Sequence, residues 1–216
     1  MNIAVLGATG MAGKAIAAEA LDRGHHVIAL SRGHHAAAPR HDRLSTLAVD
    51  AADTAALHPV LGKADAAVLA IRLGPGEESR LAPLTRGVLD AAEQHGTRVL
   101  IVGGAAPLRS PTDPGRLLIE DPDYVPAAWK HVAQASLDQF KTCQRHPYSG
   151  WIYLSPPAIL EPGERTGGYR RGRGTLLTDA HGISRITAAD LAISVLDELE
   201  SPGGGQHFTV AQAASC

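Results

Sequence analysis

Cysteine is scarce in this sequence: Cys143 and Cys216 are its only two, too few for a disulfide framework and without the spacing of metal ligands. No uninterrupted apolar run approaches the roughly 20 residues that a membrane-spanning helix requires. The N-terminus leads directly into the first expected strand, so we expect no signal peptide. We therefore expect a cytoplasmic protein whose thiols are reduced.

Neither sign of charge is in excess. The 20 Lys and Arg against 22 Asp and Glu give a net charge of -2, which offers no electrostatic basis for binding nucleic acid or an anionic membrane. The 11 histidines are scattered or adjacent, so we expect them on the surface and expect no metal site. With 44% hydrophobic residues and no linker or repeat, residues 1–216 are expected to form one soluble α/β domain.

Glycines at positions 7, 10 and 13 follow an apolar run at residues 3–6 and lead directly into a helical pattern. Because glycine has no Cβ, Gly7 can make a tight turn, Gly10 can let a pyrophosphate approach the backbone, and Gly13 can let the helix lie close to the strand. The free N–H groups and dipole of the helix start favour negative charge. We predict a dinucleotide-binding loop, and a glycine-rich turn without a ligand is the alternative. The expected contacts are Gly7, Thr9, Gly10, Met11, Ala12 and Gly13.

The second expected strand, residues 26–30, indicates which dinucleotide binds. NAD-binding relatives of this arrangement place an Asp or Glu near the end of that strand, on the ribose hydroxyls. Here the chain reads Ser31-Arg32-Gly33-His34, with no acid. A guanidinium binds a 2′-phosphate in two-point fashion, so we predict NADPH rather than NADH, held by Ser31 and Arg32. Arg40 and Arg43 are candidates for a supporting role, and a solvated Arg32 is the alternative.

Short apolar strands alternate with amphipathic helices as far as residue 102. Right-handed crossovers then give a Rossmann-type, doubly wound parallel sheet with helices on both faces. Since ligands bind outside the carboxyl ends of parallel strands, the residues after each strand are further cofactor candidates. These are Asp50 and Ala51 near the adenine, Ala70, Ile71 and Arg72 beneath the ribose and phosphates, and Gly103, Gly104, Ala105, Pro156, Pro157 and Ala158 beside the nicotinamide. Asp50 could equally cap the next helix, a role for which Asp53 competes.

Two long excursions follow the fifth and sixth expected strands, at about residues 104–125 and 156–186. Loops of this length inside a compact domain usually serve function, and both should lie at the carboxyl side of the sheet. We expect them to wall a substrate pocket. Within the second excursion, the stretch from Glu161 to Gly182, which carries Tyr169-Arg170-Arg171-Gly172-Arg173, should form a hairpin.

Several segments resemble one known family. They are Gly7-Ala8-Thr9-Gly10-Met11-Ala12-Gly13, Val102-Gly103-Gly104-Ala105, Leu154-Ser155-Pro156-Pro157-Ala158, Glu161-Pro162-Gly163-Glu164-Arg165-Thr166-Gly167 and Ser184-Arg185-Ile186. The chain is similar to the atypical short-chain dehydrogenase/reductases, and within them to the NAD(P)H-binding family of NADH-flavin reductases, related to biliverdin reductase B and the NmrA-like regulators. The resemblance implies a Rossmann fold, a nicotinamide cofactor and reduction of free flavin.

The chain departs from the wider superfamily at the residues that donate the catalytic proton. Conventional members carry a Tyr-x-x-x-Lys pair, whose Lys lowers the pKa of the Tyr that protonates a carbonyl. Here Tyr124 and Lys130 are six positions apart, and the end of the fifth strand offers no serine. Reduction of an ordinary carbonyl is therefore poorly supported. A flavin needs less from the protein, because positioning supplies much of the rate and solvent can supply the proton.

The candidates for a supporting catalytic role are Lys130, His131 and Tyr124, each of which could equally be an ordinary surface or packing residue. Tyr124 and Trp129 could stack on an isoalloxazine ring. The segment Tyr169-Arg170-Arg171-Gly172-Arg173 could bind the phosphate of FMN, or could be a solvated charged face.

The leading hypothesis is an NADPH-dependent reductase that passes a hydride to a planar conjugated acceptor, a flavin first and a quinone next. FMN or riboflavin would then be a substrate rather than a bound cofactor, and the protein would act as a monomer or homodimer. Two alternatives remain open. One is a non-catalytic NADP(H) redox sensor of the NmrA type, and the other is an epimerase or dehydratase of a small metabolite.

Overall fold

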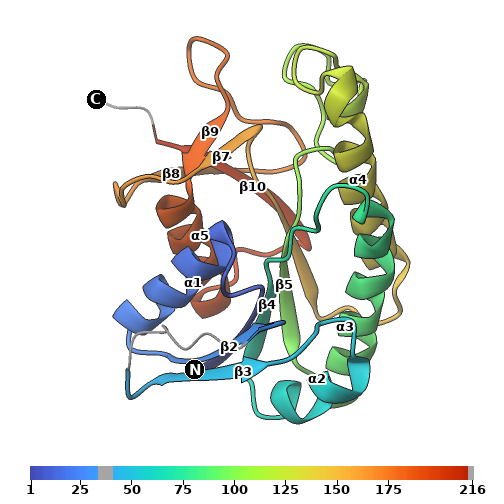
Figure 1. Cartoon of the computed structure of the whole chain (residues 1–216). Coiled ribbons are helices and arrows are strands. Elements are labelled where there is room, and N and C mark those ends of the chain that lie inside the picture. Colours follow the sequence, from blue (N-terminus) through green and yellow to red (C-terminus); the bar gives the residue numbers. More distant parts are fainter. Residues whose placement is uncertain (34–40, 214–216) are drawn as a thin grey trace.

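An eight-stranded, mostly parallel sheet forms the centre of the molecule (Figure 1). The computed structural model describes residues 1–33 and 41–213. The strand order is β3-β2-β1-β4-β5-β6-β10-β8, and β8 alone runs antiparallel to its neighbour. These strands are β1 (Asn2–Leu6), β2 (His26–Ser31), β3 (Leu44–Ala48), β4 (Ala66–Leu69), β5 (Arg98–Val102), β6 (Trp151–Ser155), β8 (Tyr169–Gly172) and β10 (His207–Gln212).

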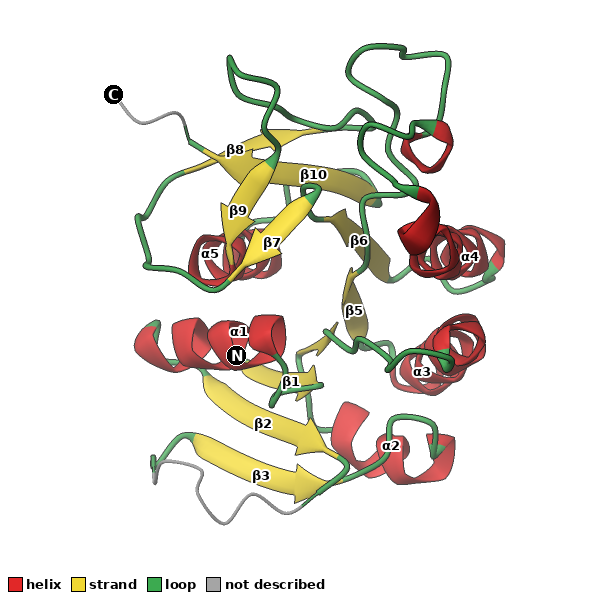
Figure 2. Ribbon diagram, turned by 45° about the horizontal axis from the view of Figure 1, so that its top comes forward, coloured by secondary structure: helices red, strands yellow, loops and turns green. Residues whose placement is uncertain are grey.

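Helices cover both faces of the sheet. Figure 2 shows α1 and α5 on one face and α2, α3 and α4 on the other. They are α1 (Met11–Asp22), α2 (Thr54–Leu61), α3 (Leu81–His95), α4 (Lys130–Arg145) and α5 (Ala188–Glu200), with 3-10 turns at Glu78–Arg80, Leu118–Glu120 and Ala127–Trp129. The predicted Rossmann-type doubly wound fold is confirmed. No helix in residues 1–33 and 41–213 is long and apolar enough to cross a membrane.

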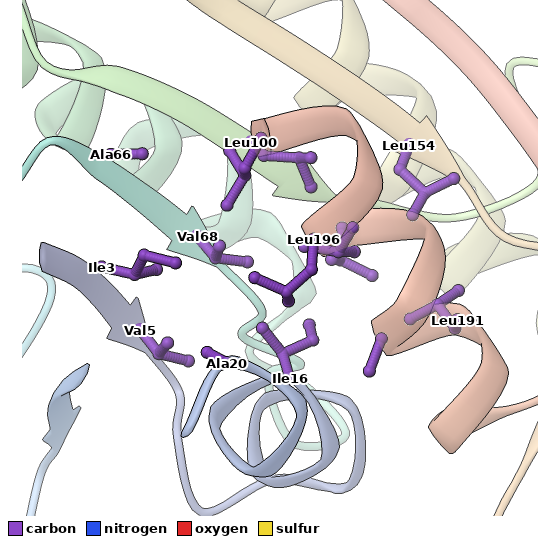
Figure 3. Packing of buried hydrophobic residues seen from close by; sticks show 14 of the residues in the cluster. Ile3, Val5, Ile16, Ala20, Ala66, Val68, Leu100, Leu154, Leu191 and Leu196 are labelled. Atoms are coloured by element: carbon purple, nitrogen blue, oxygen red, sulfur yellow. The ribbon is translucent and has the colours of Figure 1, made fainter. Parts of the chain in front are cut away.

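The two cores follow from the alternation of side chains along buried strands. In β1, Ile3 and Val5 face α1 and α5, whereas Ala4 and Leu6 face the other helices. Figure 3 shows the first cluster, where Ile16 of α1 and Leu196 of α5 meet the central strands. Each fully buried Leu or Ile contributes about 1.5–3 kcal/mol. Because central strands are buried on both faces, they carry the continuous apolar runs seen in the sequence.

Local signals set the helix ends. Asp53 caps α2, its carboxylate accepting from the Ala56 N–H at 3.1 Å, which resolves the competition with Asp50. Thr187 caps α5 by accepting from the Asp190 N–H at 3.1 Å. Gly96 ends α3 in the left-handed region at a φ of 67°. Each of these stops or starts lies where the residue types predict it.

The hairpin expected within residues 161–182 is wrong. The strand of this stretch is β8, which pairs antiparallel with β10 at the edge of the main sheet. The guanidinium groups of the three arginines in residues 169–173 are engaged within the protein. Arg171 pairs with the buried Glu198 at 2.5 Å, Arg170 donates to the carbonyls of Thr178 and Gln212, and Arg173 donates to those of Gly203 and Gly204. The Tyr169 hydroxyl donates to Asp197 at 2.7 Å.

A separate ribbon lies beside the carboxyl end of the sheet. It consists of β7 (Ile159–Glu161) and β9 (Arg185–Thr187), which pair in parallel (Figure 2). β7 follows β6 directly, and β9 leads into α5. The second excursion is thus anchored at both ends, by the main sheet and by α5.

Two histidines are not on the surface, contrary to expectation. The side chain of His146 is 2% exposed and contacts Asp90 at 3.0 Å. His207 lies against Phe140 and Tyr153 and shares a hydrogen bond with Ser155 at 2.9 Å. Burial lowers the pKa of His207 to about 4, so its ring is neutral near pH 7. In the described part of the chain, no three His, Cys, Asp or Glu side chains gather as a metal site.

Candidate cofactor site

The glycine-rich loop between β1 and α1 has the shape expected of it. Gly7 has a φ of 87°, and a Cβ there would lie 2.5 Å from the Ala70 carbonyl oxygen. A Cβ on Gly13 would lie 2.1 Å from the Gly7 oxygen, so α1 can approach the strand only through glycine. A Cβ on Gly10 would meet nothing closer than 3.4 Å. No other part of the described protein therefore crowds the position where a side chain on Gly10 would lie.

The start of α1 is open to an anion. Gly10 precedes the helix in an extended conformation, and within the described residues no side chain caps the helix or places an acid in its first turn. The Gly10 N–H donates to Gly7 at 3.0 Å and the Lys14 N–H to Gly10 at 2.8 Å. The N–H groups of Met11, Ala12 and Gly13 have no partner within the helix, as in any first turn. These groups fit the diphosphate of a dinucleotide.

The residues expected at a 2′-phosphate lie at the carboxyl end of β2. Arg32 is exposed there, and the Ser31 hydroxyl donates to the Gly33 carbonyl at 2.9 Å. Arg40 lies outside the described residues. Arg43 cannot assist, because it precedes β3 at the opposite edge of the sheet, where its carbonyl accepts from Val27 at the start of β2.

A cavity of about 260 Å³ opens between the starts of α2 and α3. Its lining includes Ala51, Thr54 and Leu84. Asp50 is exposed beside it, with its carboxylate accepting from the Ala52 N–H at 3.0 Å. The end of β3 therefore adjoins a hollow on the side of the sheet where the sequence predicts the adenine.

The residues expected beside the nicotinamide follow β5 and β6, which are adjacent strands. Gly103 and Gly104 have a structural reason to be glycine that sequence reasoning missed. A Cβ on Gly103 would lie 2.0 Å from the Tyr153 hydroxyl, and one on Gly104 would lie 2.7 Å from the Ser136 hydroxyl. The Gly104 N–H donates to Tyr153 at 3.3 Å. Ala105, Pro156, Pro157 and Ala158 continue these two strand ends.

No tyrosine of the described residues is arranged as a catalytic acid. The hydroxyls of Tyr148, Tyr153 and Tyr169 donate to Thr97, Ser136 and Asp197. Tyr124 packs beside a small cluster that includes Leu108 and Leu118. Burial, together with Asp121 and Asp123, raises the pKa of Tyr124, the reverse of the shift that a Tyr-Lys pair produces.

The other catalytic candidates lie at the start of α4. Lys130 is exposed there, and His131 is 59% exposed with its ring 3.4 Å from the Glu78 carboxylate. The Ser110 hydroxyl is buried and donates to Asp121 at 2.6 Å. The site therefore combines a cradle for a dinucleotide with exposed side chains at the start of α4, and no tyrosine of residues 1–33 and 41–213 is arranged as its acid.

Comparison with known sequences decides the family. The family model described as NAD(P)H-binding matches residues 7–199, from the first glycine of the loop to the end of α5. The chain belongs to the NAD(P)H-binding family. The resemblance drawn from the motifs is thereby confirmed, and the dinucleotide that this family binds is the group that the glycine loop fits.

Three relatives of this NAD(P)H-binding protein cover nearly its whole length. The uncharacterized protein YwnB of Bacillus subtilis is 34% identical over 220 residues, which are 99% of this chain and 100% of YwnB. A Streptococcus pneumoniae structure, provisionally named an NADH-flavin reductase, is 28% identical with a TM-score of 0.87, over 99% of this chain and 100% of that one. A Bacteroides thetaiotaomicron structure, provisionally named an epimerase, is 29% identical with a TM-score of 0.89, over 100% of this chain and 98% of that one.

The family motif at residues 161–167 is held by two buried carboxylates. Asp190 of α5 accepts from Thr166 at 2.6 Å, from the Gly167 N–H at 2.9 Å and from Gln212 at 2.5 Å. Glu19 of α1 accepts from Arg165 at 2.8 and 3.0 Å. Sequence reasoning missed both carboxylates. The groups that donate to Asp190 and Glu19 from segment 161–167 and from Gln212 lie far from them in the sequence. The one local signal is Thr187, which starts α5 three residues before Asp190.

The charge of these two carboxylates is stabilised in place. Hydrogen bonding from Arg165 lowers the pKa of Glu19 although burial opposes it. Burial alone would raise the pKa of Asp190, but the hydrogen bonds from Thr166, Gln212 and Gly167 together hold it below its ordinary value. Segment 161–168 is thus fixed to α1 and α5, and with it the ribbon that follows Pro156, Pro157 and Ala158.

Proposed function

We propose that this NAD(P)H-binding protein is an NADPH-dependent reductase that transfers a hydride to a planar conjugated acceptor, a flavin first and a quinone next. One observation carries the proposal: among the described residues, the hydroxyls of Tyr148, Tyr153 and Tyr169 are engaged within the fold and Tyr124 packs beside an apolar cluster, so no tyrosine is arranged as the acid that carbonyl reduction requires. A hydride donor held beside an acceptor that takes its proton from water requires positioning alone. The Streptococcus relative's name, an NADH-flavin reductase, supports the same acceptor class.

The cofactor part of the proposal assigns roles to named groups. The N–H groups after Gly10 would hold the diphosphate, Ser31 and Arg32 the 2′-phosphate, and Asp50 with the adjacent cavity the adenine. Ala70 and Ile71 would lie along the ribose, since they follow the neighbouring strand β4. The choice of NADPH rests on Arg32 standing where an NAD site carries a carboxylate.

When bound, NADPH supplies a hydride from its nicotinamide C4–H bond, which a flavin accepts at N5 while N1 takes a proton from solvent. The protein's part is to orient the nicotinamide and the acceptor ring toward each other. Gly104, Ala105 and Pro157 follow β5 and β6, and none of them has a side-chain group that could donate or accept a proton. Lys130 and His131 are exposed at the start of α4, where they can bind acceptor or ribose oxygens.

Two other functions follow from particular observations. A non-catalytic NADP(H) sensor is favoured by the same absence of an acid in the described residues. An epimerase is the name of the Bacteroides relative, but it needs both an acid and a base on its substrate. No tyrosine of the described residues is arranged as such an acid, so this function ranks third.

The proposal is tested by steady-state loss of the nicotinamide absorbance when the purified protein receives NADPH with FMN, riboflavin or a quinone. We expect turnover with FMN and with a quinone, and none when the acceptor is omitted. We also expect Tyr124→Phe to change kcat less than about threefold, because this hydroxyl is not the proton donor. Tight NADP binding with no turnover on any acceptor would instead favour the sensor.

A further inference from the structure

Trp129 is exposed at the carboxyl edge of the sheet, and it is unusual in this chain. Of the aromatic side chains in the described residues, which include every Trp, Tyr and Phe, the other seven are buried or partly buried. Trp129 is 55% exposed, at the end of the 3-10 turn Ala127–Trp129 that leads into α4. Tyr124, the other aromatic considered for stacking, packs against an apolar cluster instead. One aromatic face is thus open beside the candidate site.

Arg72 reaches this face from a different element. It follows β4, is exposed, and places its guanidinium carbon 6.0 Å from the centre of the Trp129 ring. Among the described residues neither Arg72 nor Lys130, the next residue after Trp129, forms an ion pair. Of the acids nearest in sequence to Arg72, Glu77 pairs with Arg80, and the Glu78 carboxylate lies 3.4 Å from the His131 ring. An open aromatic face therefore coincides with positive charge that has no ion-pair partner among the described residues.

We propose that Trp129 and Arg72 form the recognition site for the acceptor, and that they select a planar ring carrying an anionic group. Applied to flavins, this means FMN rather than riboflavin, which has the same ring without the phosphate. The inference rests on the proposed reductase function and names the substrate class of that site.

Stacking of a flavin on Trp129 is energetically favoured over the contact that Arg72 makes with this ring. An exposed cation–π contact contributes about 0.5–1 kcal/mol, and 6.0 Å is at its outer limit. Stacking of a planar base on an aromatic side chain contributes about 1–3 kcal/mol. A flavin ring therefore displaces the guanidinium from Trp129. The released Arg72 stays on the same edge, where a charge-assisted, two-point hydrogen bond to a phosphate is its strongest available interaction.

The test compares FMN and riboflavin in binding and in turnover. Kd is measured by calorimetry with NADP⁺ present, and quenching of tryptophan fluorescence is followed in parallel. Trp151, which is 5% exposed, supplies the background emission that remains in Trp129→Leu. In Arg72→Met we expect the Kd of FMN to rise about tenfold or more, as loss of one charge-assisted contact implies, with riboflavin changed less than about twofold. In Trp129→Leu we expect both flavins to weaken about tenfold and the flavin-dependent quenching to disappear.

Arg145→Met is the matched control, because Arg145 is the last residue of α4, the helix that follows Trp129, and so lies at the opposite edge of the sheet. It should leave both flavins unchanged. Equal weakening of FMN and riboflavin in Arg72→Met, a weaker NADP⁺ Kd in place of a weaker FMN Kd, or full quenching in Trp129→Leu would overturn the recognition site. If wild-type protein turns over riboflavin as well as FMN, this inference fails while the reductase stands. If it binds and reduces neither flavin nor quinone, both fail.

Discussion

In a Gly13→Ala variant we expect the free energy of unfolding to fall by at least about 3 kcal/mol, at the upper end of what overpacking costs. The added Cβ would lie 2.1 Å from the Gly7 oxygen and 2.7 Å from the Gly7 carbonyl carbon. Both atoms are backbone, so relief requires α1 to move away from β1. Since domains are stable by only about 5–15 kcal/mol, the loss should be plain in urea denaturation.

Gly10→Val provides the comparison within the same loop. Its side chain enters space where a Cβ meets nothing closer than 3.4 Å, and the extended backbone of Gly10 suits any residue. We expect its free energy of unfolding to stay within about 1 kcal/mol of wild type. Its Kd for NADPH should nevertheless rise about 100-fold or more, because the valine occupies the approach of the diphosphate. Unchanged NADPH affinity in Gly10→Val, or wild-type stability in Gly13→Ala, would contradict these roles.

Arg32→Asp should reverse the preference between the two nicotinamide cofactors. We expect the Kd of NADPH to rise about 100-fold, as replacement of a charge-assisted contact by repulsion implies, and that of NADH to change less than about threefold. Arg43→Asp makes the same change of charge at the opposite edge of the sheet, and should affect neither cofactor. Titration of both variants with both cofactors gives the comparison. Parallel losses of NADPH and NADH in Arg32→Asp would remove Arg32 from the 2′-phosphate.

The features that could be predicted from sequence are those with local causes. Gly7 and Gly13 are required by a turn and a helix contact that involve only neighbouring residues and Ala70. The strands of the first half were recognisable because burial on both faces leaves unbroken apolar runs, as in Ile3 to Leu6. Asp53 and Thr187 cap helices through hydrogen bonds that span three residues.

The features that could not be predicted depend on distant partners. Arg171 reads as part of a solvated charge run until Glu198, 27 positions later, is seen to pair with it. Asp190 reads as an ordinary helix-start residue until segment 161–168 folds over it. His207 is buried only because Phe140 and Tyr153 close over its ring. Nothing in the spacing of these residues indicates such contacts, since the topology alone brings them together.

The same division applies to the candidate site. The cradle for the dinucleotide is local and could be predicted, whereas the meeting of Arg72 with Trp129 joins the end of β4 to the start of α4. The structure was also needed to see that the tyrosine hydroxyls are engaged. Tyr153, for example, lies beside Gly103 and donates its hydroxyl to the Ser136 carbonyl. Sequence reasoning could show that a Tyr-Lys pair is missing, but not which hydroxyls remain available.

An anaerobic single turnover tests the reductase most directly. Protein preloaded with NADPH is mixed with FMN, and the absorbance of the nicotinamide and of the oxidised flavin is followed together. We expect both bands to decrease at one rate. The decreases should correspond to equal concentrations of NADPH oxidised and flavin reduced, since one hydride leaves NADPH for each flavin reduced. Loss of the nicotinamide band without the flavin band, or stable binding of both with no change in either, would contradict hydride transfer to a flavin by this protein.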